Sequence, residues 1–207
     1  SCSSARCDPP LPLPPSMTTA VPPTTTAAPT AAPTGAPRGG PPPLRQIALG
    51  DLEHELATTR RVLERVPTAH LGYKPHEKSF TLQQLAAHTA NISGWGTTTM
   101  TTDALDFAQP MEQPALPTTT EELVAAFDAG AARLRAAIEG ASDEALRATW
   151  TARRGERVIF ALPRVGVLRG FIVSHLIHHR AQLGVYLRLL DLPVPSMYGP
   201  TADEGTF

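Results

Sequence analysis

The sequence predicts an all-α fold, a four-helix bundle with a short hairpin or extended connection before the last helix. Three observations lead to this fold class. Apolar residues recur at helical spacing in four separate stretches after residue 43. Among the residues after residue 43, only residues 148–162 have a pattern typical of a hairpin. The first 43 residues hold 13 of the 22 prolines, so they cannot build a hydrophobic core.

We therefore divide the chain into a disordered, low-complexity tail rich in Pro, Thr and Ala, residues 1–43, and one folded domain, residues 44–207. A domain of that length buries roughly two thirds of its unfolded surface. The tail lacks the basic start and apolar stretch of a secretory signal, so we expect a cytoplasmic protein. Met17 is the first methionine. We expect residues 1–16 to be an upstream remnant rather than a lipid-anchored stalk.

Charge and hydropathy exclude two classes of partner. The 18 basic and 19 acidic residues give a net charge of −1 without any block of basic residues, whereas nucleic-acid binding needs a concentrated basic face. No apolar run approaches the roughly 20 residues of a membrane-spanning helix. We therefore expect no nucleic-acid and no membrane partner. Both cysteines, Cys2 and Cys7, lie in the tail, so the domain has no thiol for a disulfide, a metal or nucleophilic catalysis.

The first predicted helix covers residues 47–66, where charged residues separate the members of one apolar stripe before Pro67. The second helix begins at Thr81, because Thr81 and Gln84 have the spacing of a capping box. The apolar stripe of the first helix is Leu49, Leu52, Leu56, Leu63 and Val66. That of the second is Leu82, Leu85, His88, Ile92 and Trp95, which places His88 on the buried face.

The third helix is predicted to start after Thr119, with Glu122 as its capping partner, and to end at Gly140. Residues 148–162 then form the hairpin or extended connection. The last helix begins after Pro163 and is stopped by the prolines that follow residue 192. Its inward stripe is Leu168, Ile172, His175, His179, Leu183, Tyr186 and Leu190.

Three of the seven histidines lie on inward stripes. His175 and His179 are four residues apart on one helix, so they are neighbours on one face and can chelate one ion. His88 would supply a third nitrogen across the bundle core. Three neutral imidazoles leave one position open on a tetrahedral ion such as zinc, as in metal sites that perform chemistry.

The alternative for these positions is purely structural. A single histidine on an apolar stripe is usually a core residue with hydrogen-bonded ring nitrogens, and a lone His-x-x-x-His pair arises by chance in His-rich helices. The three positions taken together favour a metal site. His178 is rotated about 100° from His179, so it should face a neighbouring helix or solvent. We expect surface positions for His54, His70 and His76.

Residues 74–88, residues 175–188 with their His-His-Arg-x-Gln-Leu motif, and the ending at residues 193–204 resemble the DinB family of four-helix metal-binding proteins. The resemblance covers about residues 44–204. It implies that one histidine of the second helix and two of the fourth bind the metal, which here are His88, His175 and His179. Imidazole accepts several divalent transition metals, of which we expect zinc or nickel. The resemblance also implies a damage-inducible stress protein, and a possible homodimer.

The wider superfamily uses low-molecular-weight thiols, in S-transferases and a thiol-dependent isomerase. We therefore expect a metal-dependent enzyme, an S-transferase or a hydrolase, in which the ion lowers the pKa of a thiol or of water. Its partner would be a small-molecule substrate, and no catalytic residue is assigned.

Two alternatives stay open, a non-catalytic stress-induced bundle that binds metal or a ligand, and a dimeric bundle without metal. Tyr198, Asp203 and Glu204 would either line the pocket or form an exposed tail. Trp95 would wall the pocket or lie in the core.

Overall fold

The computed structural model describes residues 42–111 and 115–205. The predicted disorder of the tail falls almost wholly on residues 1–41, outside the described residues. Within the described ranges, no helix is both long enough and apolar enough to cross a membrane.

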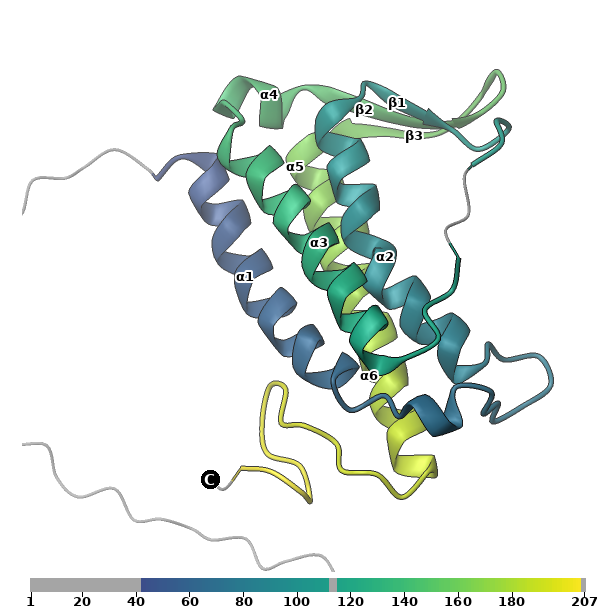
Figure 1. Cartoon of the computed structure of the whole chain (residues 1–207). Helices are drawn as coiled ribbons and strands as arrows, with labels where there is room; N and C mark the ends of the chain where they lie inside the picture. The colour runs from purple at the N-terminus through teal and green to yellow at the C-terminus, as the bar shows by residue number, and fades with distance from the viewer. Residues whose placement is uncertain (1–41, 112–114, 206–207) are drawn as a thin grey trace, which may run out of the picture. The chain divides into compact units, whose positions relative to one another are not determined.

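Four long helical segments form the bundle (Figure 1). The first three are α1 (Leu44–Leu63), α2 (Leu82–Thr101) and α3 (Thr120–Glu139). The fourth is continuous but has three parts, α5 (Arg164–Val167), the π-helical segment η2 (Leu168–Val173) and α6 (Ser174–Leu189). Two short helices, η1 (Thr68–His70) and α4 (Asp143–Arg147), lie in the connections. The predicted four-helix arrangement is therefore confirmed.

The helix boundaries follow from local capping. Thr81 and Gln84 form the predicted capping box, in which each side chain accepts a hydrogen bond from the other residue's backbone N–H. Thr119 caps α3 by accepting from the backbone of Glu122. The Glu122 carboxylate instead accepts from Thr118, so this second box is not reciprocal. The first helix starts and ends three residues earlier than predicted.

A small sheet, which corrects the all-α prediction, lies at the end of the bundle where α2 ends and α5 begins (Figure 1). The predicted hairpin is confirmed as β2 (Thr149–Arg154) and β3 (Arg157–Pro163), with Gly155 in the turn at a φ of +59°. The strand β1 (Ala104–Asp106), which no sequence pattern predicted, pairs in parallel with β2. With only three residues, it is too short to show alternation.

One hydrophobic core runs through the bundle and receives residues from all four long segments. The predicted stripes contribute to it, for example through Leu52 of α1 and Leu85 of α2, each 2% exposed, and Leu134 of α3 is also fully buried. At Gly96 a Cβ atom would lie 2.8 Å from the side chain of Leu134, so α2 approaches α3 too closely for a larger residue. This packing fixes α2 relative to its neighbours and with it the position of His88.

Candidate metal centre

The structure brings together the three histidines on which the sequence analysis converged. His88 projects from α2, and His175 and His179 project from the same face of α6. Their ring nitrogens all lie within 4.8 Å of one another, and among the described residues they form the group able to hold a metal ion. All three rings are half-buried.

The Nε2 atoms point toward one another. His175 Nε2 lies 2.8 Å from His179 Nε2 and 3.2 Å from His88 Nε2. A tetrahedral zinc ion with nitrogen ligands at about 2.0–2.1 Å holds neighbouring nitrogens roughly 3.3 Å apart. The two distances from His175 Nε2 are close to that value and the whole group lies within 4.8 Å, so the three imidazoles could hold a divalent transition metal.

The histidines have pKa values that keep the rings neutral, the form that ligates metals. Burial, aided by the charge of His179, lowers the pKa of His88 below its usual value. Burial together with the neighbouring histidines lowers the pKa of His175 to about 4. For His179 the same desolvation lowers the pKa, although a hydrogen bond to Gln182 opposes it.

Gln182 decides which nitrogen of His179 faces the cluster. Its Oε1 atom lies 2.7 Å from His179 Nδ1. An amide oxygen can only accept a hydrogen bond, so Nδ1 carries the proton and donates it. The lone pair of His179 then lies on Nε2, which faces His175. Sequence reasoning did not single out Gln182, although its position one helical turn after His179 was a usable signal.

Two aromatic side chains flank the cluster. The ring of Trp95 lies 6.3 Å from that of His175, and the ring of Phe80 lies 6.3 Å from that of His88. Both are partly exposed, with Trp95 at 37% and Phe80 at 51%. Of the two expectations for Trp95, the structure therefore favours a wall beside the histidines over a core position.

Two cavities border the cluster, one at His88 and the other at His179. One, of about 400 Å³, lies between α2 and α3 and includes His88, Asn91 and Arg133 in its lining. The other, of about 310 Å³, lies beside α6 and includes His179 and Gln182. A ligand could therefore approach the cluster from either side.

The remaining histidines lie away from the cluster's centre. His178 is exposed, as predicted, although its ring lies 4.8 Å from that of His179. The predicted surface positions of His54, His70 and His76 are also confirmed.

The C-terminal segment does fold back, but onto α1 and α6. Tyr198 donates a hydrogen bond to the Glu55 carboxylate (2.7 Å), which also pairs with Arg180 (2.7 Å). The acidic residues of the segment form ion pairs, Asp203 with Arg188 and Glu204 with Arg61 and Arg65. Tyr198 is exposed, at 64%, as one expectation held, but the segment is anchored to α1 and α6 instead of forming a free tail, and the contacts described for these residues do not include the three histidines.

Comparison with known proteins agrees with the resemblance to the DinB family. Residues 51–183 match the family model described as the DinB superfamily. The uncharacterized protein YrdA of Bacillus subtilis (strain 168) is 29% identical over 155 residues, which cover 73% of this chain and 86% of YrdA.

Two solved structures are similar at 20% identity and a TM-score of 0.57, which shows a common fold. One is a DinB-like protein from Bacillus cereus ATCC 10987, for which the match covers 74% of this chain and 97% of that chain. The other is the DinB-like protein YjoA of Bacillus subtilis, with coverage of 73% and 96%.

Proposed function

Since the chain belongs to the DinB superfamily, we propose that it is a metal-dependent enzyme that activates a low-molecular-weight thiol, or water, for attack on an electrophile. The observation that carries this proposal is the convergence of three Nε2 atoms from His88, His175 and His179. Zinc or nickel is the expected ion. The substrate is a small molecule, and a cytoplasmic location and a homodimer belong to the same proposal.

The donor set supports a catalytic rather than a purely structural ion. Structural zinc sites are closed by four protein ligands, whereas catalytic sites use three and keep one position open. In the described part of the chain, the group holds three residues and includes no carboxylate or cysteine. A metal ion bound there would lower the pKa of a thiol or water molecule at the open position toward neutrality.

The chain's own residues would hold the metal ion and orient its ligands. The three imidazoles bind through Nε2, and Gln182 keeps His179 in the required tautomer. The rings of Trp95 and Phe80 provide apolar surface beside His175 and His88. The nucleophile comes from outside, because both cysteines precede the domain.

The proposed transfer is a substitution in which the thiol sulfur replaces a leaving group on the electrophilic carbon. The external thiol releases its proton to solvent, its sulfur forms a bond to the electrophilic carbon, and the bond from that carbon to the leaving group breaks, so that the leaving group departs as an anion with the bonding electron pair. With water in place of the thiol, the same sequence is a hydrolysis. No side chain of this protein is assigned as the acid or base.

A direct test is a rate assay with small thiols and a chromogenic aryl halide, run on protein loaded with zinc or nickel. A rate above the protein-free control that is lost in His175→Ala supports the enzyme. The matched control is His178→Ala, on the same helix but exposed, which should retain the rate. No turnover at full metal occupancy would instead favour the alternative, a non-catalytic stress protein that binds metal or a ligand.

A further inference from the structure

The cavity between α2 and α3 contains one permanently charged side chain. Besides His88, the lining residues are Gln84, Ala87, Ala90, Asn91, Ala115, Leu116, Pro117, Ala126, Ala129 and Arg133. None of them is acidic. The cavity beside α6 also has no acidic residue, its lining being Ser79, Phe80, Leu85, His179, Gln182, Val185 and Tyr186. Among the described residues that line these two cavities, Arg133 is the one permanently charged side chain.

Local sequence leaves Arg133 without a carboxylate three or four positions away on its own helix. The side chains three and four positions away on α3 are Ala129, Gly130, Ala136 and Ala137. Across the described ranges, Arg133 forms no ion pair within 4.0 Å, unlike Arg135 two residues later, which pairs with Glu53.

The exposed guanidinium of Arg133 lies near Gly130, on the side of α3 that faces α2. Its Nη2 atom lies 3.9 Å from the point where a Cβ of Gly130 would stand, and the carbonyl oxygen of Ala90 on α2 lies 3.7 Å from the same point. Ala90 is two residues from His88. His88 of α2 and Arg133 of α3 therefore line the same cavity from the two helices that enclose it.

The positive charge at this cavity indicates which kind of ligand it would bind. Three neutral imidazoles would leave the full charge of a bound divalent ion uncompensated, and Arg133 adds a positive charge to the cavity that His88 lines. A ligand that occupies the cavity and compensates this charge is an anion. Arg is suited to a carboxylate, because its planar fork donates two parallel hydrogen bonds.

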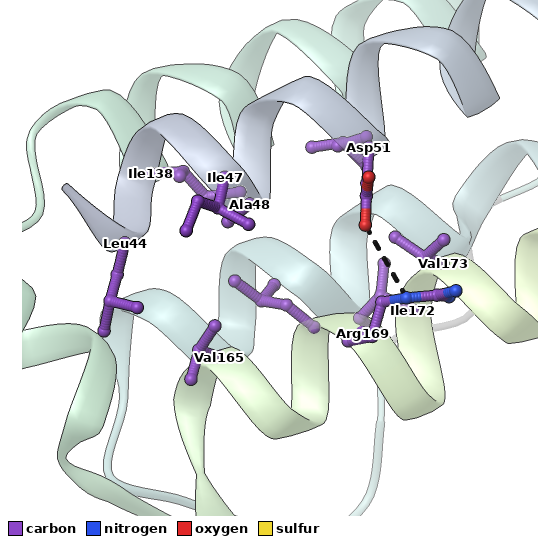
Figure 2. A pocket seen from close by; sticks show the side chains of 11 residues that line it. Leu44, Ile47, Ala48, Asp51, Ile138, Val165, Arg169, Ile172 and Val173 are labelled. Carbon is purple, nitrogen blue, oxygen red and sulfur yellow. Dashed lines mark ion pairs between the residues drawn. The ribbon is translucent and has the colours of Figure 1, made fainter. Parts of the chain in front are cut away.

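The cavity of about 290 Å³ between α1 and the α5–η2 segment is different (Figure 2). Most of its lining is aliphatic, and its two charged residues, Asp51 and Arg169, lie 3.7 Å apart as an ion pair. Its charges compensate each other and none of the three histidines lines it. Arg169 is therefore the matched control for Arg133, an exposed arginine that lines a cavity elsewhere.

We propose that the cavity shared by His88 and Arg133 binds an anionic small molecule, specifically a thiol that carries a carboxylate, with the carboxylate on Arg133 and the sulfur at the histidine cluster. This inference rests on the proposed function and narrows its substrate class.

The test uses cobalt-loaded protein, in which visible absorption reports a thiol at the ion whether or not the protein turns over. Linear mercapto acids of three to six carbons are titrated in parallel with mercapto alcohols of equal length. We expect at least one acid to bind roughly tenfold more tightly than its alcohol, as a charge-assisted hydrogen bond allows. In Arg133→Met this preference should disappear while alcohol binding is unchanged, and Arg169→Met should behave as the wild type.

The outcomes separate the two proposals. Equal binding of acids and alcohols, or an acid preference that persists in Arg133→Met, would overturn the anionic substrate class and leave the thiol site standing. If cobalt binds and no thiol of either kind changes its spectrum, both thiol proposals are wrong. Failure to take up cobalt overturns the metal site itself. Thermal unfolding of both arginine variants confirms that they are folded.

Discussion

The contact between Gln182 and His179 makes the metal affinity depend on a residue that is not a ligand. Replacing Gln182 with Met keeps the length of the side chain but removes the acceptor that lies 2.7 Å from His179 Nδ1. His179 is then free to carry its proton on Nε2, and that tautomer cannot bind a metal through the Nε2 atom that faces the cluster. Loss of such outer partners typically weakens metal binding 10- to 100-fold, or about 1.4–2.7 kcal/mol.

The assay is competition for zinc against a chromogenic chelator at pH 7. Gln182→Met should lose affinity within that range, whereas Gln182→Glu should keep it, because a carboxylate also accepts from Nδ1–H. Gln46→Met, at an exposed position on α1, is the control for a surface Gln-to-Met change. Equal zinc affinity of Gln182→Met and the wild type, with both folded, would refute the role assigned to this hydrogen bond.

Three further predictions concern stability. Arg180→Ala should cost about 3–5 kcal/mol in urea unfolding, because Arg180 is 1% exposed and its loss leaves the Glu55 carboxylate buried without its partner; a cost near zero would contradict the buried pair. Phe127→Ala should cost about 3–5 kcal/mol by the same measurement, because Phe127 fills the core at 1% exposure; a cost below about 1 kcal/mol would contradict its packing. Metal-free protein should lose stability as the pH falls from about 6.5 toward 4. His175 has a pKa of about 4 when folded, so the unfolded chain binds more protons in that window. Urea unfolding from pH 7 to 4.5 measures the slope, and an unchanged stability would contradict the lowered pKa values.

The helices and the histidine cluster were predictable because their signals are local. Thr81 and Gln84 mark the start of α2 within four residues, and His175 and His179 share a face by helical periodicity alone. The approach of His88 from α2 followed from its place on the buried stripe.

The features that sequence reasoning missed depend on distant segments. β1 exists because it pairs with β2, more than forty residues later in the chain. Arg180 and Glu55 are charged, and such residues are almost never fully buried unless paired. Their ion pair joins α6 to α1, and no short-range sequence pattern predicts this ion pair. Arg133 went unnoticed for the same reason, since its importance comes from the cavity it shares with His88.

The central claim is that His88, His175 and His179 bind one metal ion, and metal content per chain tests it most directly. Plasma mass spectrometry on untagged protein purified without chelators should find about one equivalent of a transition metal. The metal should be lost in His88→Ala and retained in His178→Ala. A metal-free wild type that also fails to take up added zinc or nickel would contradict the account, and the three histidines would then be core residues.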